Sequence, residues 1–353
     1  MLCYHFKMKK LNYAIIGNGN LGKACKEQIL KRPDEFDLVG TFSRRESDET
    51  IPYQHLERYL GEIDVTLFCG GSSNDAPIMV PELNEMGLST VDSYDNHGEI
   101  KNQNYQNAIK QATDKSETTA IIGAGWDPGF LSIQRILNKA LIPDGAHNTF
   151  YGGERGGLSM GHTNALKRID GVIDAFQVTR ASTAAIHKAL DGIVVPKEQR
   201  HERDCYIVAQ PGKEEYIQEQ ILNMEGYFKG QIVKIRFITN DFEKVKASNL
   251  GQTPVVFRSV YWENDIAKVM EAIKENALGY PNGHSGQVIA SDDNGKINLG
   301  LEMKSNPIFT ANAMLAYGKA NHTMQKRGLK GTFTIDEVPP AFLVDNDVRL
   351  GEI

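Results

Sequence analysis

The sequence predicts an α/β protein, with an N-terminal Rossmann-type doubly wound parallel sheet and a second, α+β domain. Three observations support this class. Short apolar runs alternate with helical patterns over the first third of the chain, as expected for a parallel sheet covered on both faces. A glycine-rich turn follows the first apolar run. Beyond about residue 128, longer runs alternate apolar with polar residues, which indicates a sheet with one exposed face.

The first domain is expected to span residues 8–127. Its predicted strands are 13–16, 36–42, 64–69, 88–92 and 118–123. The second domain is expected to span residues 128–309, with predicted strands at 231–237 and 296–303 and a helix at 214–223. An apolar helical pattern begins near Thr310, so residues 310–353 are expected to pack back on the first domain.

The composition excludes some classes of function. With 39 Lys and Arg against 45 Asp and Glu, the net charge is −6, which argues against broad binding of nucleic acid or of an anionic membrane. No apolar run approaches the roughly 20 residues that span a bilayer. The four cysteines form no CxxC pair, so we expect a reducing cytoplasm rather than a disulfide framework or a zinc site. The N-terminus lacks the pattern of a secretory signal, and the true start, Met1 or Met8, stays open.

The motif GNGNLG, residues 17–22, follows the first strand and opens a helix. In this position Gly17 permits a tight turn, Gly19 lets the backbone approach a pyrophosphate, and Gly22 lets the helix pack closely on the sheet. A chance glycine turn fits this context less well. The expected dinucleotide contacts of this loop are Gly17, Asn18, Gly19, Asn20, Leu21 and Gly22.

The ends of the second and third strands indicate which dinucleotide binds. An NAD enzyme usually has an acidic residue after the second strand, whereas this chain has Ser43, Arg44 and Arg45. Two guanidinium groups favour a 2′-phosphate, and therefore NADP(H), over the alternative of a solvated basic loop. The third strand ends in a CGGSS run, which lets a nicotinamide ribose approach the backbone. The expected contacts there are Cys69, Gly70, Gly71 and Ser72, with the Cys69 thiol packed rather than nucleophilic.

Two further strand ends carry carboxylates. TVDSYDNH (residues 90–97) contains Asp92 and Asp95, and GAGWDPGF (residues 123–130) contains Asp127. At the carboxyl edge of the sheet these groups suit a cationic substrate group such as an ammonium. The alternatives are Asx turns for the first two residues and helix capping for Asp127.

The same stretch contains other candidates. Asp92, Ser93 and Tyr94 are expected cofactor neighbours, and Asn96 and His97 are expected to hold the shape of the loop. A metal site that includes His97 is disfavoured, because no third ligand stands at a recognisable spacing. We therefore expect no metal.

The chain resembles the meso-diaminopimelate dehydrogenase family. The motifs that carry the resemblance occur in the family's order from residue 8 to about 340. They are GNGNLG, FSRR, VDSYDNH, GWDPG, LSMGHTNALKRI, RDCYIV, NPIFTANAMLAYGKA and TFTIDEVPP.

The resemblance implies a reversible, NADPH-linked oxidative deamination of the D-centre of meso-2,6-diaminopimelate to L-2-amino-6-oxopimelate, the open form of tetrahydrodipicolinate, and ammonia. It further implies a homodimer, in which the second domain binds substrate and builds the dimer. A broader D-amino acid dehydrogenase and a non-catalytic NADP-binding regulatory protein are the alternatives.

The resemblance also implies roles for individual residues. Asp92, Asp95 and Asp127 would surround the reacting amine, with no general base assigned among them. Backbone amides at Met160 and Gly161 would hold one carboxylate of the substrate. The remaining implied substrate contacts are Trp126, Phe150, Thr179, Arg203 and Asn306.

Two departures from the family pattern leave the substrate range open. The loop at residues 151–163 is longer than usual, carries Glu154 and Arg155, and has Met160 where a glutamine is usual. Residues 253–278 resemble an insertion. After that insertion, His284 is preferred over Asn282 as the equivalent of the family's substrate histidine.

Overall fold

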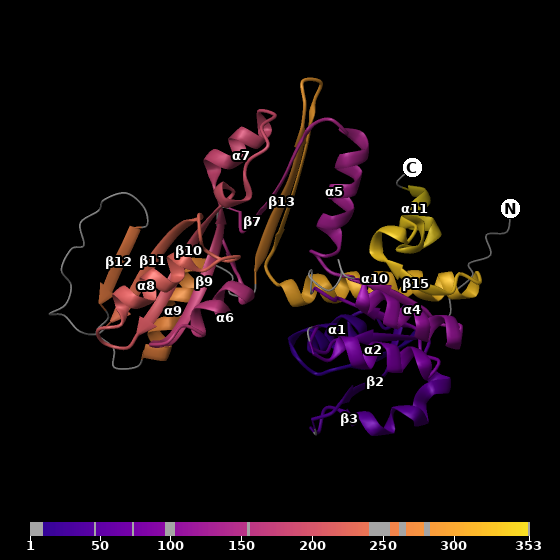
Figure 1. The fold of residues 1–353 in the computed structure, drawn as a ribbon. Coiled ribbons are helices and arrows are strands. Elements are labelled where there is room, and N and C mark those ends of the chain that lie inside the picture. Colours follow the sequence, from indigo (N-terminus) through magenta and orange to yellow (C-terminus); the bar gives the residue numbers. More distant parts are fainter. Residues whose placement is uncertain are drawn as a thin grey trace. The chain divides into compact units, whose positions relative to one another are not determined.

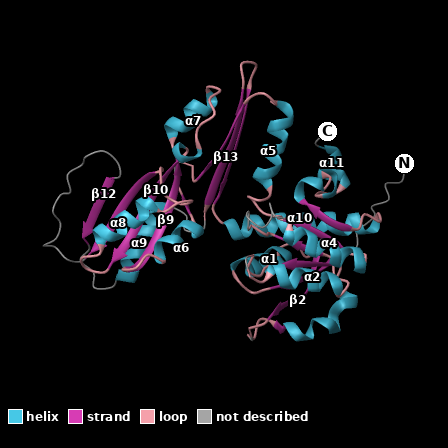
Figure 2. Ribbon diagram, in the orientation of Figure 1, coloured by secondary structure: helices cyan, strands magenta, loops and turns pink. Residues whose placement is uncertain are grey.

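The computed structural model describes residues 10–45, 47–72, 74–95, 103–153, 156–239, 255–260, 266–278 and 283–351. The chain forms two compact units (Figures 1 and 2). Unit 1 consists of Met1–Ile133 and Pro307–Ile353, and unit 2 of Gln134–Asn306. No helix within the described part of the chain is long and apolar enough to cross a membrane.

Unit 1 contains a seven-stranded sheet in the order β15-β6-β5-β4-β1-β2-β3. All neighbouring strands are parallel, which confirms the predicted Rossmann-type sheet. The strands are β1 Leu11–Ile16, β2 Phe36–Ser43, β3 Ile51–Pro52, β4 Val65–Phe68, β5 Thr90–Asp92, β6 Thr119–Ile122 and β15 Gly331–Thr334. Every residue of β4 and β6 is buried, which explains why these strands are apolar except for Thr66 and Thr119.

Helices cover both faces of this sheet and form two apolar cores. One core joins α1 and α10 to β1, and the other joins α2 and α4 to the opposite face. The helices of unit 1 are α1 Asn20–Leu30, η1 Tyr53–Glu62, α2 Ala76–Glu85, α4 Asn104–Ser116, α10 Asn306–Lys326, η4 Ile335–Glu337, η5 Pro340–Phe342 and α11 Asn346–Gly351. Helix α5, Phe130–Leu141, spans the boundary with unit 2.

The C-terminal segment is an integral part of unit 1. Helix α10 begins at Asn306 rather than near residue 310, since proline is favoured in a first helical turn. A Cβ at Gly318 would lie 2.5 Å from the Tyr13 hydroxyl, so this helix packs directly on β1. Asn321 Nδ2 donates to the carbonyl oxygens of Thr90 and Thr119, both at 3.0 Å, and thereby links β5 to β6.

Unit 2 contains a mixed five-stranded sheet, β12-β11-β10-β9-β8, and an antiparallel three-stranded sheet, β14-β13-β7. The strands are β7 Ala146–Tyr151, β8 Gly157–Leu158, β9 Val172–Ala181, β10 His201–Ala209, β11 Ile232–Thr239, β12 Val255–Val260, β13 His284–Ser291 and β14 Lys296–Met303. The helices are α6 Met160–Lys167, α7 Thr183–Leu190, η2 Lys197–Gln199, α8 Glu214–Asn223 and α9 Ile266–Leu278.

The residues that resemble an insertion form secondary structure of their own. Strand β12 adds a parallel edge strand to β11. Helix α9 packs on the same sheet, where its buried Met270 joins Phe176, Val178 and Ile238 in one apolar cluster. The described residues of this segment, β12 and α9, therefore extend and cover the five-stranded sheet.

Candidate active site

The glycine-rich turn has the geometry of a dinucleotide loop. Gly17 has φ +110°, and a Cβ there would lie 2.8 Å from the carbonyl oxygen of Cys69. A Cβ at Gly22 would lie 2.0 Å from the Gly17 carbonyl oxygen, so helix α1 approaches the turn as closely as glycine allows. Beside Gly19 the space is open, and the first turn of α1 carries no acidic residue and no side-chain cap. These features fit a pyrophosphate at the positive end of the helix dipole.

The basic residues after β2 lie next to the loop after β4. Arg44 Nη2 donates to Asp75 Oδ1 at 2.5 Å, while Asp75 Oδ2 accepts from the Gly71 amide at 3.1 Å. The Gly71 amide and then Arg44 hold the pKa of Asp75 below its usual value. The Arg44 side chain is 62% exposed, and Arg45 is exposed too, with its amide donating to Ser43 Oγ at 3.1 Å. Both guanidinium groups are accessible to a 2′-phosphate.

Cys69 is a packed thiol. Its Sγ lies 3.7 Å from Sγ of Cys25, and both side chains are buried. The contact with Cys25, and then burial, raise the pKa of Cys69 well above its ordinary value. A thiol held neutral in this way is a poor nucleophile, so Cys69 shapes the loop through its backbone.

Asp92 was predicted to accept a hydrogen bond from the substrate amine, but its side chain lies in the core of unit 1. Asp92 is 1% exposed. Its Oδ1 accepts from the amides of Tyr94 and Gly123 at 2.9 and 3.1 Å, and its Oδ2 accepts from the Tyr105 hydroxyl at 2.7 Å. Burial raises the pKa of Asp92 to about 6, against the lowering effect of these hydrogen bonds. The carboxylate is turned into the protein, and the alternative of an Asx turn is correct for this residue.

The Tyr94 side chain, expected beside the cofactor, lies in the core of unit 1. Its ring is 1% exposed and stacks on Tyr105, with ring centroids 3.9 Å apart. Ser93 is half-buried, and Asp95 is exposed at the surface. Of the two aspartates on the described part of this loop, Asp95 is therefore the exposed one.

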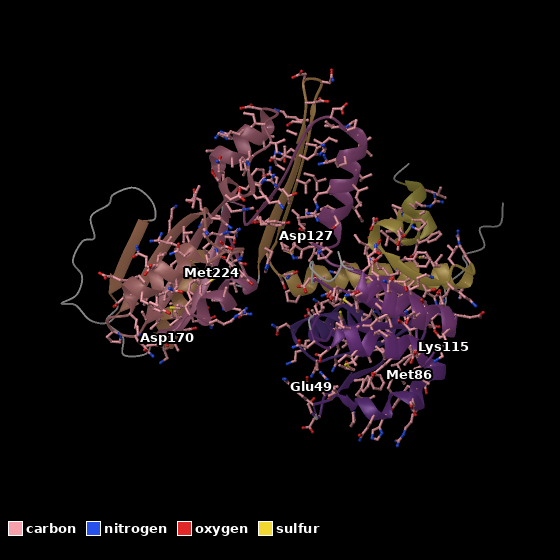
Figure 3. The ribbon with its side chains drawn as sticks, viewed as in Figure 1. Glu49, Met86, Lys115, Asp127, Asp170 and Met224 are labelled. Carbon is pink, nitrogen blue, oxygen red and sulfur yellow. The ribbon has the colours of Figure 1, made fainter. Side chains whose placement is uncertain are left out.

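Asp127 lies at the foot of α5, on the loop that follows β6 (Figure 3). The helix begins at Phe130, so Asp127 does not cap it, and the capping alternative is wrong. Ser132 Oγ donates to Asp127 Oδ1 at 3.5 Å and accepts from the Gly129 amide at 3.3 Å. Asp127 and the neighbouring Trp126 are both half-buried. This loop lies beside the loop after β5, because the Ala124 amide donates to the Asp92 carbonyl at 2.7 Å.

In unit 2 the structure brings Arg203 and Thr179 together. They are directly opposite on β10 and β9, and Arg203 Nη1 donates to Thr179 Oγ1 at 2.6 Å. Arg203 Nε donates to Gln231 Oε1 at 2.7 Å. Across the described ranges, no carboxylate lies within ion-pair distance of Arg203, and burial lowers its pKa to about 10. A half-buried cation without an acidic partner among the described residues is a favourable place for an anionic ligand.

Two histidines near Arg203 were not predicted from the sequence. Burial, and then the charge of Arg203, lower the pKa of His162 to about 4 and that of His201 to about 3. The Nδ1 atom of His162 lies at hydrogen-bond distance, 2.8 Å, from the Oγ atom of Ser159. The alternation of β10 could have indicated His201, because residues two apart on a strand share a face.

The remaining predicted contacts lie on different elements. Gly161 is exposed in the first turn of α6, with open space beside its Cα. The side chain of Met160 lies outside the described residues. His284 begins β13 and Asn306 begins α10. Phe150 is fully buried in a cluster with Ala185 and Ile289, so it is a core residue, and it also forms part of the wall of a pocket in unit 2.

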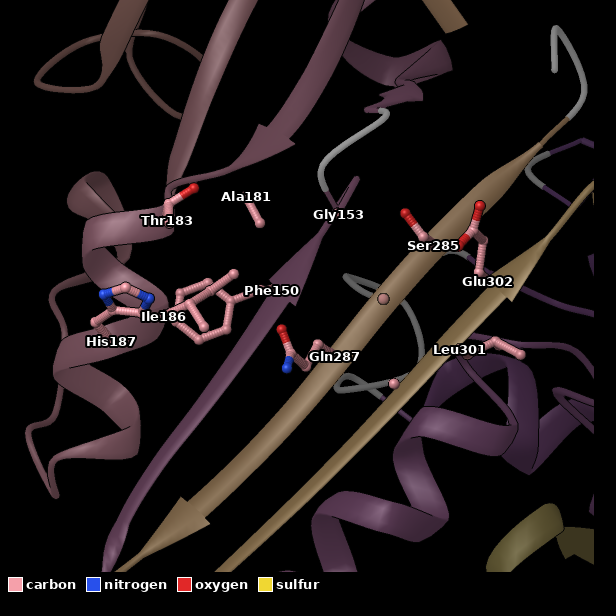
Figure 4. A pocket seen from close by; sticks show the side chains of 12 residues that line it. Phe150, Gly153, Ala181, Thr183, Ile186, His187, Ser285, Gln287, Leu301 and Glu302 are labelled. Atoms are coloured by element: carbon pink, nitrogen blue, oxygen red, sulfur yellow. The ribbon is translucent and has the colours of Figure 1, made fainter. Parts of the chain in front are cut away.

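A pocket of about 500 Å³ lies between α7 and the three-stranded sheet (Figure 4). Of the predicted substrate residues only Phe150 lines it, and neither Thr179 nor Arg203 does. The other lining residues are Gly153, Ala181, Thr183, Ile186, His187, Ser285, Gly286, Gln287, Gly300, Leu301 and Glu302.

Several candidates fall outside the described residues, namely Asn96, His97, Glu154, Arg155 and Asn282. Among the residues that are described, no group of three or more His, Cys, Asp or Glu side chains could hold a metal ion.

Comparison with known proteins identifies the family. Residues 125–275 match the model of the diaminopimelic acid dehydrogenase C-terminal domain. The chain is 34% identical to a meso-diaminopimelate D-dehydrogenase of Corynebacterium glutamicum over 346 residues, covering 95% of this chain and 96% of the relative. The chain belongs to the diaminopimelate dehydrogenase family. A second member, from Acetivibrio thermocellus, is 31% identical, with 95% of each chain covered.

Solved structures of the family extend the likeness to the whole fold. The C. glutamicum enzyme in complex with diaminopimelate matches with a TM-score of 0.76 at 32% identity, over 98% of this chain and 99% of the other. An engineered D-amino acid dehydrogenase bound to NADP⁺ matches with a TM-score of 0.72 at 30% identity, over 97% and 99%.

The neutral histidines beside Arg203 predict acid sensitivity of unit 2. In the folded chain the pKa of His201 is about 3, against an ordinary 6.5, so only the unfolded chain takes up its proton as the pH falls below 6.5. The contribution of neutral His201 to the free energy of unfolding is therefore fully present above pH 6.5 and is lost as the pH falls toward 3. From pH 7 to pH 5 we expect His201 to reduce the free energy of unfolding by about 2 kcal/mol.

Chemical denaturation of the wild type and of His201→Gln at these two pH values measures the effect. The glutamine oxygen can still accept the Tyr151 amide, which donates to His201 Nε2 at 2.9 Å. An equal pH dependence in both proteins would contradict the assignment.

Proposed function

We propose that this chain catalyses the reversible, NADP-linked oxidative deamination of the D-centre of meso-2,6-diaminopimelate. The products are L-2-amino-6-oxopimelate and ammonia, and the reverse reaction supplies a precursor for lysine and peptidoglycan. The observation that carries the proposal is Arg203, a half-buried guanidinium beside Thr179 with no acidic partner in the described part of the chain. Such a group needs an anion, and the substrate has two carboxylates.

Unit 1 supplies the residues for the cofactor. The turn from Gly17 to Gly22 would hold the pyrophosphate, and Arg44 and Arg45 would hold the 2′-phosphate. When bound, NADP⁺ supplies the hydride acceptor for the α-carbon. The backbone of the loop after β4, from Cys69 to Ser72, would adjoin the nicotinamide ribose, because ligands of such sheets bind at the carboxyl ends of the strands.

Asp95 and Asp127 are the proposed acceptors for the ammonium of the D-centre. Both follow carboxyl ends of parallel strands, and neither is sequestered in the core. Each carboxylate can accept a charge-assisted hydrogen bond and so orient the amine. Either residue could take the proton from the amine, directly or through water, once the substrate is bound. Trp126, next to Asp127, would form a wall over the ligand.

Residues of unit 2 are proposed to bind carboxylates of the substrate. Arg203 and Thr179 would bind the distal end, where a planar guanidinium matches a carboxylate with two hydrogen bonds. The amides at the start of α6, near Gly161, would bind the other carboxylate at a helix N-terminus. His284 and Asn306 are proposed as further contacts.

The test is an assay of NADP⁺ reduction with separate isomers of 2,6-diaminopimelate. We expect turnover with the meso isomer and at least about 100-fold lower kcat/KM with the LL and DD isomers, because the pocket must accept one D-centre and one L-centre. Nucleotide binding without turnover on any isomer would refute the proposal and favour a regulatory protein. Good turnover with simple D-amino acids would favour the broader dehydrogenase, which the departures in the 151–163 loop make a second candidate.

We further propose that the protein is a cytoplasmic homodimer. Ile136, Leu137 and Leu141 on α5 are apolar and between 46% and 70% exposed, and exposed apolar side chains on one helix suit an interface between subunits. Sedimentation equilibrium at micromolar concentration tests this proposal, and a mass of one chain would contradict it.

A further inference from the structure

Asp92 connects two neighbouring loops of unit 1. Its Oδ1 accepts from the amide of Tyr94, on the loop after β5, and from the amide of Gly123, on the loop after β6, at 2.9 and 3.1 Å. Its main-chain oxygen accepts from the Ala124 amide at 2.7 Å. A single buried residue therefore sets the spacing between these loops.

Tyr105, on α4, completes the arrangement. Its hydroxyl donates to Asp92 Oδ2 at 2.7 Å. Its ring stacks on that of Tyr94, with centroids 3.9 Å apart and an interplanar angle of 20°. Tyr105 is 3% exposed and Tyr94 is 1% exposed, so water does not compete for these contacts. Tyr105 thus contacts Asp92 through a hydrogen bond and Tyr94, the residue before Asp95, through ring stacking.

We propose that Asp92 and Tyr105 are positioning residues that fix the loop of Asp95 relative to the loop of Trp126 and Asp127. This inference rests on the proposed function, in which Asp95 and Asp127 bind the reacting amine. Hydride transfer needs the α-carbon aligned with the cofactor, and a displacement of about 1 Å can reduce the rate by about 100-fold. Asp92 and Tyr105 would act through alignment, without contacting the substrate.

Three substitutions separate positioning from direct contact. Asp92→Asn keeps an oxygen that accepts both amides, so kcat with meso-diaminopimelate should stay within about threefold of wild type. Asp92→Ala removes the acceptor, and kcat should fall by about 100-fold, with a much smaller change in the Kd for NADPH. Tyr105→Phe, which removes only the hydroxyl, should lower kcat by about tenfold. An equal loss in the Asn and Ala variants would overturn the proposal, because it would indicate that the charge acts on the substrate.

Asn84→Ala is the matched control for general loss of packing. Asn84 is also fully buried, and its Nδ2 donates to the Leu88 carbonyl and to Thr90 Oγ1, at the opposite end of β5. This variant should lower the melting temperature without lowering kcat at a temperature where it is folded. If kcat fell as far in Asn84→Ala as in Asp92→Ala, the loss in Asp92→Ala would be explained by reduced stability alone, and the proposal would be overturned.

A second readout does not depend on turnover. The chain has two tryptophans, so in a Trp262→Phe background the emission reports on Trp126 and hence on the loop after β6. Asp92→Ala and Tyr105→Phe should shift this emission, and Asp92→Asn should not. An unshifted emission in Asp92→Ala would overturn the positioning role even if the wild type lacked activity, whereas a wild type inactive on every isomer would overturn the proposed function alone.

Discussion

Arg203→Ala is expected to raise the KM for meso-diaminopimelate by about 100-fold, with a smaller effect on kcat. In the wild type the guanidinium is half-buried beside Thr179, without an acidic partner among the described residues. Its removal would leave a substrate carboxylate desolvated and unpaired. Initial-rate kinetics over a wide range of substrate concentration measure the effect.

The same substitution should leave the protein about as stable as the wild type. Burial opposes the charge of Arg203, as its lowered pKa shows, and this cost offsets the hydrogen bonds to Thr179 and Gln231. We expect the free energy of unfolding to change by less than about 1 kcal/mol. Arg203→Met, which retains the apolar stem, separates lost packing from lost charge.

Arg168→Ala is the control for the loss of an arginine. Arg168 is exposed at the end of α6, and its Nε donates to the Asn164 carbonyl oxygen of the same helix. Its KM should equal that of the wild type. If Arg203→Ala also kept the wild-type KM, Arg203 would have no role in substrate binding.

Replacing both Arg44 and Arg45 by alanine should weaken NADPH binding by about 100-fold and NADH binding by less than about threefold. The two guanidinium groups follow β2 at the place where the ribose of the dinucleotide is held, and only NADPH carries a phosphate there. Arg44 is already oriented by Asp75, but this ion pair is exposed and therefore weak. Fluorescence titration with each nucleotide gives both dissociation constants.

Arg58→Ala, an exposed arginine on η1 of the same unit, is the matched control. It should bind both nucleotides like the wild type. Ionic strength offers a further check, because the preference of the wild type for NADPH should decrease with salt, whereas the double variant should show little salt dependence. Equal losses for NADPH and NADH would refute the assignment of the 2′-phosphate site.

The parallel sheet was predictable because its signal is local. Buried strands such as β4 and β6 are mainly apolar, with one threonine each, and Gly17 and Gly22 occur where only glycine fits. The edge strand β15 was not predicted. Its four residues are all half-buried, and their place beside β6 depends on contacts distant in sequence.

The burial of Asp92 and the exposure of Asp95 could not be predicted from local sequence patterns. Asp92 and Asp95 are three positions apart and equally polar in sequence, yet one is buried under three hydrogen bonds and the other is exposed. The buried position of Asp92 depends partly on Tyr105, which belongs to another element and donates to its carboxylate.

Local patterns were enough to predict the dinucleotide fold and the family, and to indicate a 2′-phosphate, because glycine spacing, apolar runs and the charges after β2 lie in neighbouring residues. The burial of Asp92 between the two loops, the place of Phe150 in the core and the contact of Arg203 with Thr179 became known only from the fold. These outcomes depend on strand register and on burial, since a residue's hydrogen-bond partners and its access to water are set by segments far away in the chain.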